Sequence, residues 1–200
     1  MTNRLLGWVI GMLLLTGCAS PAPQTAVATE DGSASVAEAS MNELYLLVSI
    51  SERTVRAFRG DEEIRSDPIA VGDEEHPTPP GEFTTHQIDW NPDWTPPDSE
   101  WAEDRQNKEP GHEDNPMGRV RMVYERPYSL HGTEALESLG HAQSHGSIRV
   151  ANESIIELAK LVMEAGGEAR PESWYQETLA NPTEMREVHL SNPVLLRNVK

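Results

Sequence analysis

Downstream of residue 43, the hydrophobic and polar positions follow the short periods that are typical of β-strands. The run Leu44–Ile50 is dense in strand-forming residues, as a buried strand is. Residues 54–59 alternate between polar and apolar side chains, which indicates a strand with one buried face. A turn at Gly60-Asp61 separates them from the next predicted strand, over 64–71. Short strands joined by tight turns favour antiparallel pairing over strand–helix–strand units.

The rest of the chain continues this pattern and adds a few helices. The clearest helix follows Asn152, a favourable N-terminal cap, and ends at Gly166-Gly167. Shorter helices are predicted over 133–139 and 172–179. Further strands are predicted over 82–88, 120–124, 128–131, 147–150 and 187–190. The predicted fold class is therefore mostly β with a few short helices.

The stretch 90–118 interrupts the strand pattern. It contains Trp90, Trp94 and Trp101 among several prolines, followed by acidic and polar residues. A long irregular segment inside a compact domain is usually functional. The tryptophans fit either the wall or lid of a groove, or plugs that hold the loop on the core, and the sequence leaves both interpretations open.

The N-terminus has the pattern of a bacterial export signal. Arg4 is followed by the apolar run Leu5–Leu15, which is too short to cross a bilayer. The segment Leu15–Cys18 resembles the lipobox of bacterial lipoproteins. That resemblance implies cleavage after residue 17 and acylation of Cys18, and Ala19 in place of an aspartate favours the outer membrane. Residues 18–42 contain almost no large apolar side chains and are predicted to be a flexible tether.

Charge and cysteine content exclude several classes of function. The formal net charge is -17, which argues against nucleic acid as a partner and against a basic membrane-binding patch. Cys18 is the only cysteine. The folded part therefore has no disulfide, no cysteine-ligated zinc and no catalytic thiol.

Two histidine-containing motifs carry the candidate chemistry. The segment Ser144–Val150 reads Ser-His-Gly-Ser-Ile-Arg-Val, and His131-Gly132-Thr133 precedes it. This spacing is consistent with a hydroxyl nucleophile and its base brought together from neighbouring strands. A glycine-containing turn with a polar histidine is the alternative interpretation.

An ordered set of segments, beyond these two motifs, resembles the L,D-transpeptidase (YkuD-like) catalytic domain, which remodels bacterial peptidoglycan. The resemblance covers about 43–192, leaves 193–200 as a C-terminal tail, and implies a β-sandwich or open barrel. The segments that carry it are Leu44–Ile50, Pro79–Phe83, Trp90–Pro97, Asn115–Gly118, His131–Thr133 and Ser144–Arg149.

The resemblance implies a role for each motif residue. Ser147 occupies the nucleophile position, His131 the base position, and backbone N–H groups of Gly146 and Ser147 the oxyanion hole. Residues that shape the site or hold substrate are His145, Arg149, Ser144, Gly132 and Thr133. The implied partner is the peptidoglycan stem peptide in the periplasm, and the reaction releases D-Ala through an acyl-enzyme.

The resemblance implies no metal or organic cofactor. The histidines that could suggest a zinc site, His112, His131, His141 and His145, show no His-Glu-x-x-His spacing.

The sequence departs from the family at its nucleophile, because the family uses cysteine where this chain has Ser147. A thiol near a histidine reaches a useful thiolate fraction at neutral pH, whereas a serine must lose its proton during attack. Three interpretations stay open: a serine-based transferase or hydrolase, a catalytically impaired protein that binds stem peptides, or a chain in which serine replaces a natural cysteine.

Overall fold

A computed structural model describes residues 43–200. The predicted signal peptide (1–17) and the whole of the predicted tether with its Cys18 (18–42) lie outside the described residues. The strands are β1 (Leu44–Ser49), β2 (Thr54–Arg59), β3 (Glu62–Gly72), β4 (Gly81–Trp90), β5 (Val120–Glu125), β6 (Tyr128–Thr133), β7 (Ala142–Ser144), β8 (Ile148–Ala151) and β9 (Arg186–Val199). The helices are α2 (Asn152–Ala165) and α3 (Glu172–Ala180), with short 3₁₀ turns η1 (Glu100–Ala102) and η2 (Leu136–Ser138).

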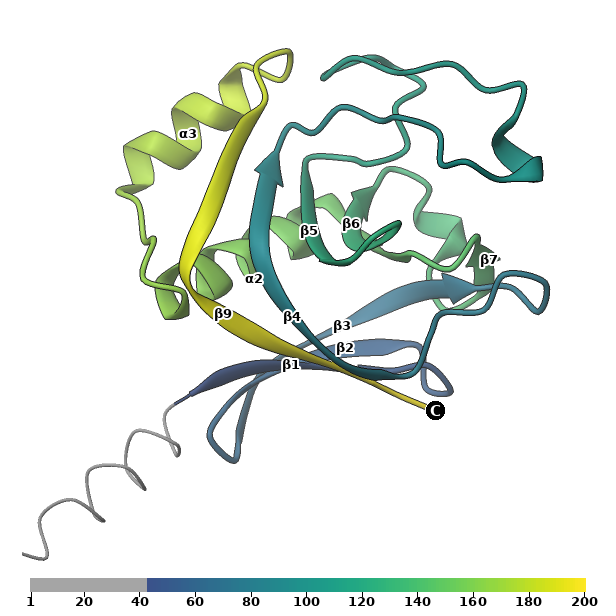
Figure 1. Ribbon diagram of the computed structural model, residues 1–200. Helices are drawn as coiled ribbons and strands as arrows, with labels where there is room; N and C mark the ends of the chain where they lie inside the picture. The colour runs from purple at the N-terminus through teal and green to yellow at the C-terminus, as the bar shows by residue number, and fades with distance from the viewer. Residues whose placement is uncertain (1–42) are drawn as a thin grey trace, which may run out of the picture.

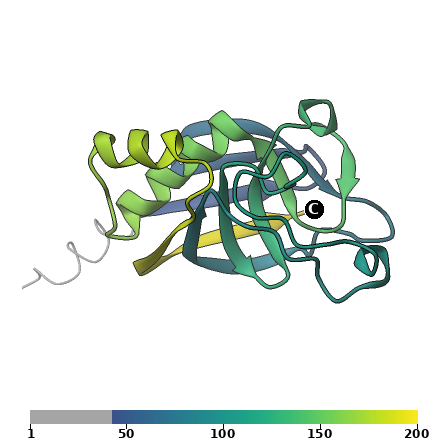
Figure 2. The ribbon, with the colours of Figure 1, turned by 90° about the horizontal axis from the view of Figure 1, so that it is seen from above.

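The strands form one strongly bent sheet that closes on itself (Figures 1 and 2). Its order is β2-β1-β9-β4-β5-β6-β8-β3-β7, and an additional pairing of β2 with β3 joins the two sides. The mostly-β prediction is confirmed, and the β2–β3 ladder turns the expected open barrel into a closed one. Closure pairs the strands that would otherwise expose unsatisfied backbone edges.

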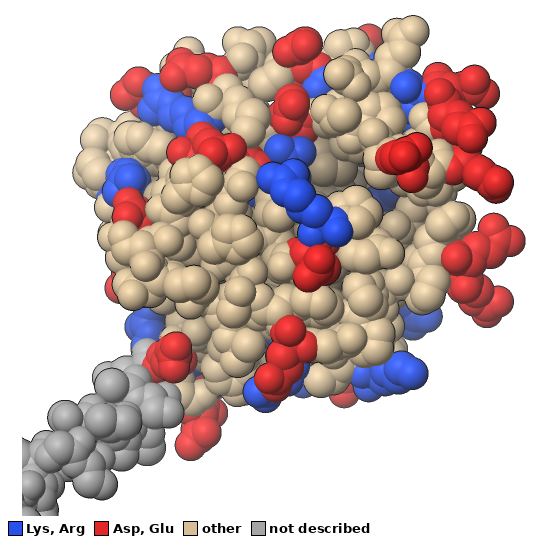
Figure 3. Space-filling view, in the orientation of Figure 1, with Lys and Arg blue, Asp and Glu red and all other residues tan. Residues whose placement is uncertain are grey.

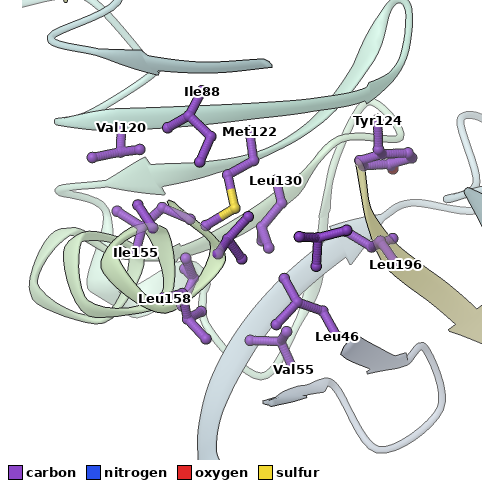
Figure 4. Packing of buried hydrophobic residues seen from close by; sticks show 14 of the residues in the cluster. Leu46, Val55, Ile88, Val120, Met122, Tyr124, Leu130, Ile155, Leu158 and Leu196 are labelled. Carbon is purple, nitrogen blue, oxygen red and sulfur yellow. The ribbon is translucent and has the colours of Figure 1, made fainter. Parts of the chain in front are cut away.

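Helix α2 packs against the sheet and completes the hydrophobic core. Ile155 and Leu158 are fully buried and point toward Met122 and Leu130 of the sheet (Figure 4). Their i, i+3 spacing places them on one helix face. Gly166 ends the helix as predicted. Within residues 43–200, neither helix has the length and hydropathy that a membrane span needs.

Three strand pairs are parallel, which the prediction of antiparallel pairing missed. They are β1 with β9, β6 with β8, and β3 with β7. A parallel pair needs a long connection between its strands. Residues 134–147 supply it between β6 and β8 and carry η2 and β7 on the way.

The C-terminal segment 193–200, expected to be a tail, forms the second half of β9 instead. This half pairs in parallel with β1 and antiparallel with β4. Val194 and Leu196 point into the core and are buried. Side-chain burial alternates from Val194 to Val199, but the residue types read Val-Leu-Leu-Arg-Asn-Val and do not alternate, so local periodicity does not reveal this half of the strand.

Two helix predictions need correction. The segment 133–139 contains only the three-residue turn η2. Asn152 is the first helical residue and does not cap the helix with its side chain. Its Oδ1 accepts the backbone N–H of Arg119 at 2.8 Å, and its Nδ2 donates to Glu134 at 2.6 Å. The amide thus joins α2 to neighbouring loops, which no local pattern encodes.

The buried position of Leu196 gives a test of the C-terminal half of β9. Leu196→Ala should lower the free energy of unfolding by about 2–5 kcal/mol, because it leaves a cavity between β9 and its neighbours. Urea denaturation measures this change. Leu136→Ala is the matched control, since Leu136 is 57% exposed and should change stability by less than about 0.5 kcal/mol. Equal effects at the two positions would contradict the assignment of 193–199 to the core.

Candidate active site

The parallel pairing of β6 with β8 brings the two histidine-containing motifs together. Leu130 pairs with Ile148 and His131 with Arg149. Ser147 directly precedes β8, and its Oγ accepts the backbone N–H of Ser129 at 3.2 Å. The candidate nucleophile therefore stands just before the strand that pairs with the strand of the candidate base.

The ring of His131 is buried and has a fixed tautomer. Its exposed fraction is 2%, and its Nδ1 lies 2.8 Å from the carbonyl oxygen of Gly132. A carbonyl oxygen only accepts, so Nδ1 carries the proton and donates it. In the neutral ring, Nε2 then holds the lone pair. The backbone carbonyl of Gly132 is the group that orients His131.

Burial lowers the pKa of His131 from its ordinary value to about 4. The positive charges of Arg149 and Arg121 lower this pKa further, while the hydrogen bond to Gly132 opposes the shift. The guanidinium of Arg121 is held by the buried carboxylate of Asp89, with 2.8 Å between Nη2 and Oδ2. At neutral pH the imidazole is therefore uncharged and can accept a proton.

Ser147 and His131 line the same cleft, which has a volume of about 2020 Å³. Ser144, His145 and Arg149 also line it. In the described part of the chain, no hydrogen bond joins Ser147 Oγ directly to the His131 ring. Figure 3 shows basic side chains beside a hollow near the centre of this face, with acidic side chains gathered along its right-hand edge.

Two side-chain hydrogen bonds hold the turn that carries Ser147. The hydroxyl of Ser144 donates to the carbonyl oxygen of Ser147 at 2.5 Å, and the hydroxyl of Thr78 donates to that of Gly146 at 3.0 Å. Gly146 has φ +96°, and a Cβ there would lie 2.4 Å from the ring of Tyr128. The position therefore requires glycine both for its backbone angle and for its contact with Tyr128.

This fold and motif arrangement has known counterparts. Residues 43–181 match the family model of the L,D-transpeptidase catalytic domain (YkuD). The chain belongs to this family. That membership confirms the family resemblance of the sequence motifs.

Individual relatives of the YkuD family agree with the assignment. A Bacillus licheniformis protein assigned to the L,D-transpeptidases (YkuD) is 31% identical over 118 residues, which is 58% of this chain and 59% of that protein. Escherichia coli K12 YbiS, assigned to the same enzymes, is 40% identical over 70 residues, which is 32% of this chain and 23% of the YbiS chain. The match thus spans well under two thirds of each curated relative's length.

A solved structure shares the fold. The NMR structure of the catalytic domain of the E. faecium L,D-transpeptidase superposes with a TM-score of 0.50 at 15% identity. The superposition covers 78% of this chain and 98% of that domain. At this identity the similarity shows the fold alone.

The sequence predicted that Gly132 and Thr133 shape the site. Neither residue lines the cleft, and both make contacts that stabilise the fold. A Cβ on Gly132 would lie 2.2 Å from Oδ1 of Asn152, so only glycine fits there. The Thr133 hydroxyl accepts the backbone N–H of Ala135 at 3.1 Å and closes the end of β6. Both residues belong to β6, the strand that carries His131.

The tryptophans of the 90–118 stretch divide between the two interpretations that the sequence left open. Trp90 is fully buried and contacts Trp174 and Tyr175, so it plugs the core. Trp101 lines the cleft and stacks on His145, with ring centroids 4.0 Å apart and an interplanar angle of 16°. Trp101 is therefore a wall of the groove.

Three residues near the motif were not selected from the sequence. The buried hydroxyl of Thr78 accepts the N–H of Gly72 at 2.8 Å and donates to the carbonyl oxygen of Gly146. Asp73 and His76 lie in the same turn, and the ring of His76 contacts that of His145. The prolines around Thr78 predicted a rigid turn. The hydrogen bond from Thr78 to Gly146, 68 residues away in the chain, has no signal in the local sequence.

The buried neutral state of His131 predicts a pH dependence of stability. Below pH 6.5 the unfolded chain protonates this ring, whereas the folded protein does not until its pKa of about 4. The free energy of unfolding should therefore fall as the pH drops from 6.5 to 4, with a contribution of up to about 3 kcal/mol. His131→Gln should remove this part of the slope in urea titrations at pH 7 and 4.5.

The exposed His112 provides the control for this measurement. His112→Gln should keep the wild-type slope. A wild-type slope in His131→Gln would show that the ring is not held neutral by the fold.

Proposed function

We propose that this protein acts on the stem peptides of peptidoglycan by acyl transfer, with Ser147 as nucleophile and His131 as base. The observation that supports this most directly is the β6–β8 register, which brings a neutral imidazole and the serine into the lining of one cleft of a YkuD-family fold. The family match supports the substrate class.

The proposed reaction has two steps. Nε2 of His131 takes the hydroxyl proton as Oγ of Ser147 attacks the carbonyl carbon of the third stem residue, a diamino acid. The C–N bond to D-Ala breaks, and the imidazolium returns its proton to the leaving amine. An amine or water then attacks the ester in the same way and releases Ser147. The N–H of Ser129, which points at Oγ, favours the negative charge that develops as the proton leaves.

Arg149 is the side chain best placed to hold a carboxylate of the stem peptide. It lines the cleft directly after Ser147-Ile148, and burial lowers the pKa of its guanidinium. Among the described residues, no carboxylate forms an ion pair with it, and burial is the one cause of the lowered pKa of its guanidinium. A partly buried guanidinium without a counter-ion favours binding of an anionic group, to which it can donate two hydrogen bonds. His145 and Ser144 are proposed to shape the same wall.

A second candidate function is binding of stem peptides without turnover. It is favoured by the serine at the nucleophile position and by the lack of a direct Ser147–His131 hydrogen bond in the described structure. In that case the cleft retains its affinity for the peptide, and the hydroxyl stays unacylated. The two functions differ only in whether Ser147 forms an ester.

We further propose the cell envelope as the site of action. Residues 1–17 fit a signal peptide and Cys18 a lipidation site, which would anchor the domain at the periplasmic face of the outer membrane. Residues 18–42 would then span the distance between lipid and domain.

Turnover of a disaccharide-tetrapeptide tests the proposed reaction. The wild-type protein should release D-Ala, followed by mass spectrometry, and Ser147→Ala should release none. His131→Gln should lower the rate by at least about a hundredfold, because the variant lacks the base that takes the hydroxyl proton.

Two results separate the candidate functions. In the first, Ser147→Cys alone releases D-Ala and the wild-type protein binds the peptide tightly. The cleft would then be intact, and the natural chain would be a binding protein. No release and no binding by any variant would contradict the substrate class itself.

Carbapenems provide an independent test of the nucleophile. They acylate the cysteine of the family, and a hydroxyl paired with a weakly basic histidine should react far more slowly. Intact mass should show no stable adduct on the wild-type protein and one adduct on Ser147→Cys. A stoichiometric adduct on the wild type that is absent from Ser147→Ala would show that Ser147 is a far stronger nucleophile than its surroundings suggest.

A further inference from the structure

A cluster of three metal-ligating side chains lies at the edge of the cleft, outside the proposed catalytic pair. Asp73, His76 and His145 each present one ligand atom, and these atoms all lie within 4.8 Å of one another. Both histidines line the cleft, and His145 stands two residues before Ser147. The proposed reaction uses neither Asp73 nor His76.

The separation of two of these atoms already suits a bound metal ion. Oδ1 of Asp73 lies 3.1 Å from Nδ1 of His76. Zinc binds imidazole nitrogen and carboxylate oxygen at about 2.0–2.2 Å in tetrahedral geometry, which puts neighbouring ligand atoms roughly 3.3–3.5 Å apart. The nitrogen of His145 needs to approach by about 1.5 Å at most to complete the set.

The backbone holds the cluster together without a metal. The N–H of Asp73 donates to the carbonyl of Ser144 at 3.0 Å, which ties the 73–78 turn to the motif segment. The N–H of His76 donates to Oδ1 of Asp73 at 2.7 Å. Trp101 covers one face of the His145 ring, and ring nitrogens bind metal in the plane of the ring, away from that stack. Such pre-ordering lowers the entropic cost of collecting the three ligands.

We propose that Asp73, His76 and His145 form a binding site for a divalent transition-metal ion of the zinc type. Two imidazoles and one carboxylate match the ligand preferences of Zn²⁺, Ni²⁺ and Cu²⁺ rather than those of Mg²⁺ or Ca²⁺. Three protein ligands leave one position of a tetrahedral ion open toward the cleft for water or a substrate group. The site shares His145 with the wall of the cleft, but zinc binding does not depend on whether Ser147 is acylated.

The alternative is that Asp73 and His76 form only an ion pair. Their 3.1 Å contact and the two backbone N–H groups on Oδ1 satisfy both side chains in the absence of metal. In that case the contacts of the His145 ring with Trp101 and His76 account for its position, and zinc binds no better here than at other surface histidines.

Zinc titration of the full-length chain in detergent tests the proposal. Calorimetry should show one saturable site in the wild-type protein, and His76→Gln should weaken it by at least tenfold. His141→Gln is the matched control, because His141 is exposed and outside the cluster, and it should bind as the wild type does. Cys18 is common to all three proteins, so any contribution of its thiol cancels in the comparison.

A second measurement uses the wild-type protein alone, so its result does not depend on whether the variants fold. Long-range ¹H–¹⁵N spectra of the wild-type imidazoles should show that one equivalent of Zn²⁺ shifts the ring nitrogens of His76 and His145 and leaves His112 and His141 unchanged. Equal affinity in wild type and His76→Gln, or shifts spread over all the exposed histidines, would overturn the proposal.

Discussion

The candidate site depends on one feature of the backbone, the parallel register of β6 with β8. Because Leu130 pairs with Ile148, Ser129 meets Ser147 and His131 lies beside Arg149. A shift by one residue would turn each of these side chains to the opposite face of the sheet. Closure of the barrel through β2 and β3 holds this register from both sides, since each strand of the ring has two neighbours. The chemistry is thus fixed by the sheet, and the loops only complete it.

Long-range hydrogen bonds then fix the turn that carries the serine. The hydroxyl of Thr78 accepts from Gly72 and donates to Gly146, so a single buried side chain links the 72–78 turn to the motif segment. The N–H of Asp73 adds a second link, to Ser144. Both connections converge on the residues just before Ser147. Buried hydrogen-bond networks of this kind restrict a segment to one arrangement, because an unsatisfied member is costly.

The sequence predicted most of the elements but fewer of their partners. Residues 54–59 and the helix that ends at Gly166 came from local periodicity, which is a property of a few neighbouring side chains. The parallel pairing of β6 with β8 and the second half of β9 depend on contacts across the whole chain. Asn152 illustrates the limit: its type predicts a cap, yet its amide binds Arg119 and Glu134 instead. The motif residues were identifiable because their family resemblance carries that long-range information, whereas Thr78, Asp73 and His76 had no such signal.

The environment of His131 sets a condition on any reaction at Ser147. Burial keeps the ring neutral, and its pKa of about 4 makes it a weak acceptor for the proton of a hydroxyl. Arg149 and Arg121 both oppose the positive charge that the ring would acquire. Asp89 already offsets the charge of Arg121, but no carboxylate in the described structure offsets that of Arg149. A substrate carboxylate bound at Arg149 would offset this repulsion and raise the pKa of the ring, although burial, the larger cause of its low value, would remain. In the proposed reaction, the bound stem peptide would therefore strengthen the base that takes the proton of Ser147. A serine would gain more from this than a thiol, which ionises without such help.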